Sequence, residues 1–132
     1  MVRLGLVVAE FADVATEMAA NARDAATAHG VDIVAERHVP GAYDTPLAAD
    51  RLARREDIDA VAVVGAIVSG DTDHDRVIAD AAATGLTDVS LDRDTPVTLG
   101  ITGPGMTSDE ARDRIDYGER AVSAAVALVE ER

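Results

Sequence analysis

Short apolar runs alternate with longer stretches of helical periodicity along the whole chain. Four runs have the length and the branched aliphatic content of strands: residues 4–8, 33–39, 60–64 and 97–101. The run at 60–64 is apolar throughout, which is typical of a strand buried on both faces of a parallel sheet. The run at 33–39 mixes apolar and charged residues, so we expect it at a sheet edge or a subunit contact.

The stretches between these runs carry apolar residues three and four positions apart, as one face of a helix does. We expect helices over residues 13–29, 45–55, 71–89 and 107–130. Short polar side chains at their starts are candidate N-caps: Asp13, Thr45, Asp71, Thr72 and Thr107, the last in a capping box with Glu110. Gly30 is placed to end the first helix, and Val77 and Ile78 are placed to face inward from the third.

The order of these elements predicts the architecture. Strand and helix alternate four times, and right-handed crossovers then produce a parallel sheet with helices on both faces. Glycines predict turns after two of the strands, one between Gly65 and Gly70 and one at Gly103 to Gly105. We found no linker or internal repeat, so the prediction is a single α/β domain of three layers with a four-stranded sheet over residues 1–132.

Composition narrows the classes of function. The net charge is −13 over 132 residues, and this excludes a nucleic-acid partner, which needs a basic surface. Every basic residue is Arg and the acidic residues are scattered, a pattern that favours a halophilic protein over an ordinary acidic one. The sequence has no Cys and no apolar run long enough for a membrane span, so we expect a soluble cytoplasmic protein.

Candidate chemistry gathers where the central strand ends. Gly70 precedes a helix start at Asp71 and Thr72, and such an N-terminus with a glycine before it can hold an anion such as phosphate. His74 falls in the first turn, where the helix dipole disfavours a charged ring, so a neutral imidazole can exchange protons near neutral pH; a solvated surface histidine is the alternative. The acidic residues around His74 match no zinc spacing, and we expect no metal and no cofactor.

Three further features have a structural and a functional interpretation. Phe11 follows the first strand and either packs in the core or stacks on a flat ligand. Asp44, in the loop before the second helix, either supplements a cap or accepts from ligand hydroxyls. Three arginines on the expected last helix either form surface ion pairs or bind phosphate: Arg112, Arg114 and Arg120.

Three segments, in this order and spacing, resemble the 6,7-dimethyl-8-ribityllumazine synthase family, especially its archaeal branch. Residues 40–46 read Pro-Gly-Ala-Tyr-Asp-Thr-Pro, and residues 64–74 read Val-Gly-Ala-Ile-Val-Ser-Gly-Asp-Thr-Asp-His. The third segment, residues 96–107, resembles the archaeal version of a later strand and turn. The resemblance covers nearly the whole chain and implies a flavodoxin-like fold. It also implies homopentamers, in many members arranged as shells of sixty subunits, with active sites between subunits.

The resemblance further implies a reaction in riboflavin biosynthesis. The amine of 5-amino-6-(D-ribitylamino)uracil condenses with the ketone of 3,4-dihydroxy-2-butanone 4-phosphate, phosphate and water leave, and the ring closes. His74 would shuttle protons. Phe11 would stack on the pyrimidine, and Ala66, Ile67 and Val68 would bind its edge. Ala42, Tyr43 and Asp44 would hold the ribityl chain, and Asp71 and Thr72 would face the phosphate. A neighbouring subunit would contribute Leu99 and Arg114, with Arg114 binding the phosphate.

The chain departs from the family pattern at a few positions. Leu99 replaces a bacterial Phe, and Asp71 and Asp73 add negative charge close to the expected phosphate. Arg120 is the nearest candidate for a lysine of bacterial members, at a different spacing. Three other functions remain open: the paralogous archaeal riboflavin synthase, a shell that binds flavin or lumazine without turnover, and a flavodoxin-like receiver or carrier module.

Overall fold

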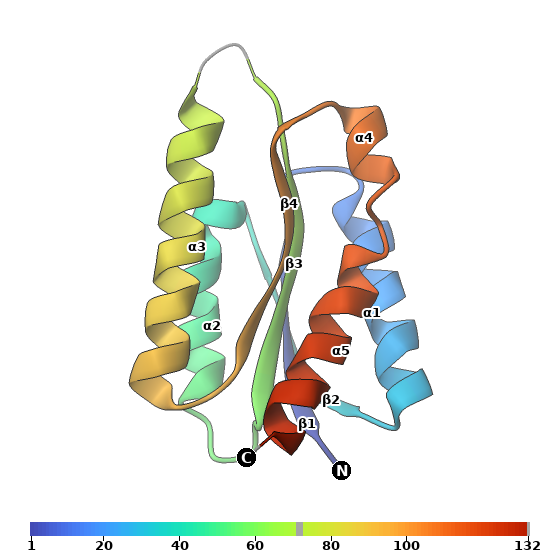
Figure 1. Ribbon diagram of the computed structural model, residues 1–132, viewed down its shortest axis with the longest axis vertical. Coiled ribbons are helices and arrows are strands. Elements are labelled where there is room, and N and C mark those ends of the chain that lie inside the picture. Colours follow the sequence, from blue (N-terminus) through green and yellow to red (C-terminus); the bar gives the residue numbers. More distant parts are fainter. Residues whose placement is uncertain (71–72, 132) are drawn as a thin grey trace.

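A four-stranded parallel sheet forms the middle layer of the molecule in the computed structural model, which describes residues 1–70 and 73–131 (Figure 1). Its strands are β1 (Arg3–Ala9), β2 (Asp32–Val39), β3 (Ala60–Val68) and β4 (Val97–Met106), in the order β2-β1-β3-β4. The parallel sheet and the edge position of β2 confirm the expectations from the sequence. The apolar run in β3 is explained by its central place, since all but its last residue are buried.

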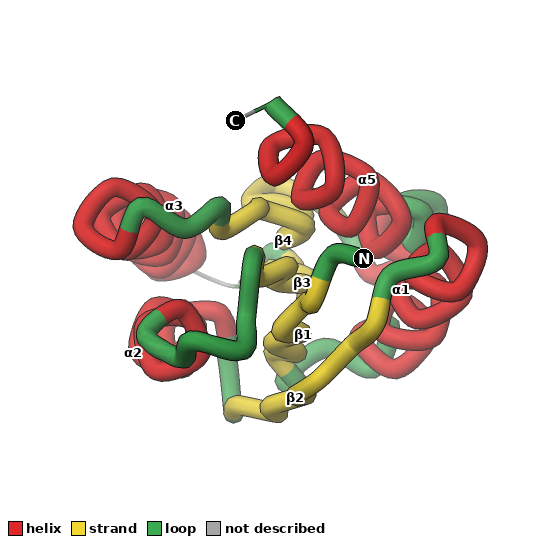
Figure 2. Tube along the Cα trace, turned by 90° about the horizontal axis from the view of Figure 1, so that it is seen from below, coloured by secondary structure: helices red, strands yellow, loops and turns green. Residues whose placement is uncertain are grey.

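Helices cover both faces of this sheet, which confirms the three-layer prediction (Figure 2). One face carries α1 (Ala15–His29), the short α4 (Ser108–Arg112) and α5 (Tyr117–Glu130). The opposite face carries α2 (Thr45–Ala53) and α3 (His74–Arg93), and a 3₁₀ turn, η1 (Ala42–Asp44), leads into α2. The carboxyl ends of the strands therefore meet at one end of the molecule, beside η1 and the start of α3.

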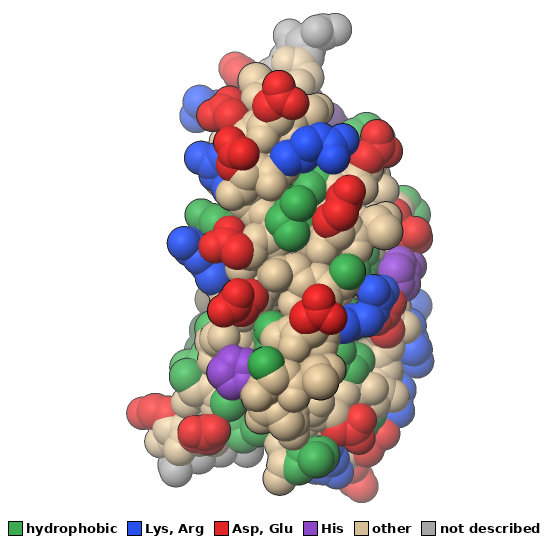
Figure 3. All heavy atoms as spheres, turned by 90° about the vertical axis from the view of Figure 1, so that its right-hand side faces the viewer, with side chains coloured by type: hydrophobic (Ala, Val, Ile, Leu, Met, Phe, Trp, Pro, Cys, Tyr) green, Lys and Arg blue, Asp and Glu red, His purple; other side chains and the backbone are tan. Residues whose placement is uncertain are grey.

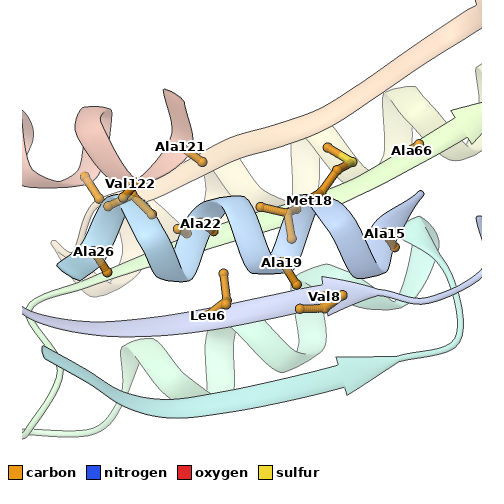
Figure 4. Packing of buried hydrophobic residues seen from close by; sticks show 14 of the residues in the cluster. Leu6, Val8, Ala15, Met18, Ala19, Ala22, Ala26, Ala66, Ala121 and Val122 are labelled. Carbon is orange, nitrogen blue, oxygen red and sulfur yellow. The ribbon is translucent and has the colours of Figure 1, made fainter. Parts of the chain in front are cut away.

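Two apolar cores, one on each side of the sheet, hold the layers together. The core under α1 is built mainly from alanines such as Ala19 and Ala22, which meet Leu6 and Val8 of β1 (Figure 4). Small side chains let helices approach closely: an added Cβ at Gly118 of α5 would overlap the carbonyl oxygen of Met18 in α1. Close packing of small residues thus takes the place of the large aromatic side chains that this chain lacks.

Both of the predicted glycine turns were wrong, because β3 and β4 run further than their apolar runs suggest. Gly65 lies inside β3, where an added Cβ would come within 2.8 Å of the Cβ of Ala9 in the neighbouring strand. Gly103 and Gly105, with φ of 97° and 80°, form an irregularity within β4 that still pairs Met106 with Val68. These three glycines are needed for close approach or left-handed backbone, and none of them ends a strand.

The helix starts also differ from the prediction. Asp13 does not cap α1, whose N-cap residue is Val14, and Thr45 is the first residue of α2 instead of its cap. The Thr45 hydroxyl is fully buried and donates to the Ala42 carbonyl oxygen at 2.7 Å, closing the η1 turn. The capping box of Thr107 and Glu110 is confirmed, with both of its hydrogen bonds formed.

The expected last helix is two helices, α4 and α5, separated by residues 113–116. This break lets α5 lie along α1, whereas α4 stays beside the ends of the strands (Figure 1). It also places Arg112 on α4 and Arg120 on α5, so these two arginines do not lie on one helix. Gly30, with φ of 68°, ends α1 as predicted.

Acidic side chains, with fewer arginines among them, are spread over the face formed by α1, α4 and α5 and do not gather into one cluster (Figure 3). In the part of the chain that the structure describes, no helix is both long and apolar enough to cross a bilayer.

Candidate active site

A pocket of about 730 Å³ opens where the strands end, between the β1 terminus, η1, the β3 terminus and the first turns of α3. We call it the main pocket. It brings together eight of the predicted site residues: Phe11, Ala42, Tyr43, Asp44, Ala66, Ile67, Val68 and His74. They come from four separate elements, and the topology of the parallel sheet alone explains why these elements meet.

The wall contributed by β3 offers free backbone. The pairing of β3 with β1 ends at Val64, whereas the pairing with β4 continues to Val68. Residues 66–68 therefore have a strand partner on one side only, among the described residues. Their other edge borders the main pocket, where backbone N–H and C=O groups can bind the edge of a planar heterocycle.

The wall contributed by η1 is a closed turn with its own hydrogen bonds. A carboxylate oxygen of Asp44 accepts from the Gly41 N–H at 3.0 Å, and the Asp44 N–H donates to the Gly41 carbonyl at 3.0 Å. One carboxylate oxygen of Asp44 is thus used to shape the loop, and the other can accept from a ligand. The capping interpretation of Asp44 is therefore confirmed, and its role toward ligand hydroxyls stays a prediction.

Phe11 stands at the mouth of the main pocket. Its side chain is 84% exposed, so the core interpretation was wrong. An exposed aromatic ring at a pocket rim is free to stack on a flat ligand. The preceding residue is anchored, because the Glu10 N–H donates to the Val39 carbonyl of β2 at 2.9 Å.

His74 is the first residue of α3 and lines the main pocket together with Asp75. Its position in the first helical turn agrees with the prediction, although the helix begins three residues later than expected. Asp71 and Thr72, the predicted phosphate contacts, lie outside the described residues. The ionisable side chains that line the pocket are two carboxylates, Asp44 and Asp75, with Tyr43 and His74, and no arginine is among its described lining residues.

The two residues expected from a neighbour, Leu99 and Arg114, do not line the main pocket of their own chain. The Leu99 side chain is 53% exposed on the edge strand β4. Arg114 lies in the connection between α4 and α5, and its guanidinium donates to the Glu110 carbonyl at 2.7 Å. Arg120 pairs with Asp116 at 3.6 Å and stacks over the Tyr117 ring, so its charge is used locally.

A side pocket of about 250 Å³ lies next to Phe11, on the side of α1 and α4. It shares Phe11 and Val68 with the main pocket and adds polar groups from Asp13, Ser108 and Arg112. The Arg112 guanidinium lies 3.9 Å from a carboxylate oxygen of Glu17, so this arginine forms a surface ion pair. Phe11 therefore borders both pockets.

Sequence reasoning missed the lining residues on α3. Val77 was expected to face inward, but it is 62% exposed and borders the main pocket with Ile78. Helical spacing from His74 could have found them, since positions 74, 77 and 78 share one face.

No group of three metal-binding side chains occurs within residues 1–70 and 73–131.

Comparison with known proteins adds independent information. The family model for 6,7-dimethyl-8-ribityllumazine synthase matches residues 1–132. A 6,7-dimethyl-8-ribityllumazine synthase of Halorubrum lacusprofundi is 67% identical over 99% of this chain and 98% of its own length. Proteins of the same description are 66% identical in Halobacterium salinarum, over 99% of both chains, and 47% identical in Methanococcus maripaludis, over 98% of this chain and 95% of the relative.

Proposed function

The chain belongs to the 6,7-dimethyl-8-ribityllumazine synthase family, and from that premise we propose that the main pocket is its active site. The activity is that of a lumazine synthase, a transferase of riboflavin biosynthesis. We treat residues 1–132 as one lumazine synthase domain. The observation that carries the site is the convergence of the eight expected residues, from four elements, on a single pocket.

The pyrimidine would lie between Phe11 and the open edge of β3. The Phe11 ring covers one face of 5-amino-6-(D-ribitylamino)uracil, and the backbone of Ala66, Ile67 and Val68 meets its polar edge. The ribityl chain extends toward η1, where backbone groups of Ala42 and Tyr43 and the free oxygen of Asp44 bind its hydroxyls. This pose places the reactive amine toward α3.

The four-carbon substrate would lie at the start of α3. Asp71 and Thr72, which lie outside the described residues, are assigned to its phosphate by the family resemblance. His74, at the start of α3, would transfer protons during imine formation and phosphate elimination. Holding both reactants side by side supplies much of the rate, because oriented reactants behave as if they were highly concentrated. A moderate contribution from His74 is then enough.

A phosphate is usually bound by a cationic side chain such as arginine. No arginine is among the described lining residues of the pocket, and two of those residues, Asp44 and Asp75, are acidic. We propose that Arg114 of a neighbouring copy supplies the cationic side chain, with Leu99 of that copy closing the pocket. Both residues lie away from their own pocket, and Leu99 is exposed on an edge strand, as this role requires. The assembly is then a homopentamer, alone or within a sixty-subunit shell.

Two incubations separate the rival functions. Purified protein is mixed either with the aminouracil and the butanone phosphate, or with lumazine alone. The proposal predicts lumazine and one phosphate per turnover in the first mixture, and no riboflavin in the second. Riboflavin from lumazine alone would instead identify the paralogous activity, and tight lumazine binding without any phosphate release would identify a storage shell.

The role of His74 is tested on the same assay. His74→Ala should lower kcat by about 10²-fold while the affinity for the aminouracil stays within about twofold, as expected for a general acid–base group. His29→Ala is the matched control, because His29 lies at the far end of α1 and contacts Ser123. Unchanged kcat in His74→Ala would remove His74 from the mechanism.

A further inference from the structure

A row of alternating charges runs from α1 to the mouth of the main pocket. The Arg23 guanidinium donates to both carboxylate oxygens of Glu36, at 2.9 and 2.7 Å. Nε2 of His38, on the same face of β2, lies 2.6 Å from the nearer of these oxygens. Nδ1 of His38 lies 3.5 Å from a carboxylate oxygen of Glu10, the residue directly before Phe11. Four side chains thus connect the helix layer to the stacking ring.

This row ties together two walls of the pocket. His38 is followed after one residue by Pro40 and Gly41, which lead into η1 and line the pocket. Glu10 leads into Phe11, and its N–H already donates to Val39. The contact between His38 and Glu10 therefore adds a side-chain link to the backbone link between the ends of β1 and β2.

The protonation state of His38 decides whether its ring can donate hydrogen bonds to both carboxylates, those of Glu36 and Glu10. A neutral imidazole has one N–H donor and one acceptor nitrogen, so a ring that donates to Glu36 turns a lone pair toward Glu10. An imidazolium has two N–H donors and can donate to Glu36 and Glu10 together. Hydrogen bonds from the Arg23 guanidinium and the His38 imidazole lower the pKa of Glu36 to about 2. The Glu36 carboxylate therefore stays charged in the pH range where histidines titrate.

We propose that His38 is a positioning residue for the pyrimidine substrate, whose imidazolium form bridges Glu36 and Glu10 and so holds Phe11 in its stacking position. The inference rests on the function proposed above, because it assigns Phe11 to the pyrimidine. The charged groups around His38 are Glu10 at the end of β1, Glu36 and Arg37 on β2, and Arg23 on α1. The Arg37 guanidinium donates to the backbone carbonyl oxygen of Glu36, so the Glu36 carboxylate interacts with Arg23 and with His38.

The expected effect is modest, because the side chains of His38 and Glu10 are 39% and 57% exposed. Ion pairs at such sites change an equilibrium by about two- to fivefold. Raising the pH from 5.5 to 8.5 should therefore raise the KM for 5-amino-6-(D-ribitylamino)uracil by about this factor in the wild type. The dependence of kcat on pH should be the same in all variants.

Three substitutions test the bridge in different ways. His38→Gln and Glu10→Gln should each show a KM that no longer depends on pH and stays at the high-pH value. His38→Arg carries a permanent charge with several donors, and its KM should stay at the low-pH value throughout. His29→Gln, remote from the pocket, should keep the wild-type profile, and circular dichroism checks that every variant is folded.

The outcomes are distinct. A His38→Gln enzyme whose KM follows pH as the wild type does, or a wild-type KM that is flat across this range, would overturn the role of His38. If His38→Gln does not fold, the Glu10→Gln variant provides the same test, because the Glu10 side chain is exposed. Absence of lumazine formation by the wild type at every pH would instead refute the proposed function, and the assignment of His38 would fail with it.

Discussion

Gly85, in the middle of α3, allows the two helices beside the pocket to touch. An added Cβ at this position would lie 2.8 Å from Cγ and 3.0 Å from Cβ of Pro46, at the start of α2. Pro46 follows the η1 turn that forms one wall of the main pocket. In the substitution Gly85→Ala, the higher helix propensity of alanine opposes a loss of packing between α2 and α3, at a site next to the η1 loop.

The two effects can be weighed. Replacing glycine by alanine inside a helix stabilises it by about 1 kcal/mol. Inserting a methyl group where there is no room costs about 1–3 kcal/mol, and here the neighbour is a rigid proline ring. We expect a net loss of about 1 kcal/mol in the free energy of unfolding, the opposite sign to an unhindered substitution.

A double-mutant cycle measures the packing contribution directly. The free energies of unfolding of wild type, Gly85→Ala, Pro46→Ala and the double variant are determined in urea at one protein concentration. Removing the Pro46 Cγ should lower the cost of Gly85→Ala by about 1 kcal/mol. Stabilisation by Gly85→Ala in the wild-type background, with no coupling to Pro46, would refute the close contact between α2 and α3.

Three further predictions concern charge, stacking and salt. Glu36 contributes stability above its ordinary pKa near 4.5, and this contribution is lost as the pH falls toward the folded-state pKa of about 2. Because Arg23 is half exposed, Glu36→Gln should cost only about 1 kcal/mol at pH 7 and much less at pH 2. A loss in urea titrations that is as large at pH 2 as at pH 7, or larger, would contradict this prediction. Phe11→Ala should weaken aminouracil binding by about tenfold or more without changing the unfolding free energy, whereas an effect on stability alone would show that the ring serves the fold. Lumazine formation should increase toward molar salt, which screens the net charge of −13; a rate that is highest in dilute buffer would contradict salt adaptation.

Periodicity predicted which elements exist better than where they end. The four runs located all four strands. The run in β3 is continuous because this strand is buried between two helical layers, whereas the edge strand β2 keeps charged residues. Glycine was misread as a turn signal at Gly65 and at Gly103, where its role is to admit a neighbouring backbone or a left-handed conformation. Such a role depends on tertiary contacts that local sequence does not contain.

The break between α4 and α5 illustrates the same limit. Residues 107–130 have a nearly continuous helical pattern, but the requirement that Gly118 lie against Met18 sets the direction of α5 separately. Only the long-range packing of α1 against α5 reveals this. The arginines of this region therefore could not be assigned to a common face from spacing alone.

The convergence of residues from separate elements on one pocket was predicted more closely than the element boundaries. Parallel strands bring their carboxyl ends to one edge, so residues after β1, β2 and β3 had to meet. The exposed position of Phe11 and the lining by Val77 could not be predicted, because both depend on how the loops and α3 close the pocket. The family resemblance supplied the substrates, which no spacing of residues could name.

The central claim is that His74 of one copy and Arg114 of a neighbouring copy act on the same pair of substrates. Differently tagged His74→Ala and Arg114→Ala subunits are produced together and purified through both tags, and phosphate release is measured with both substrates. Each variant alone should be nearly inactive. Random hybrids should recover about a quarter of the wild-type rate, since about one interface in four then joins an intact His74 to an intact Arg114. Hybrids no more active than the separate variants would contradict a pocket shared between subunits.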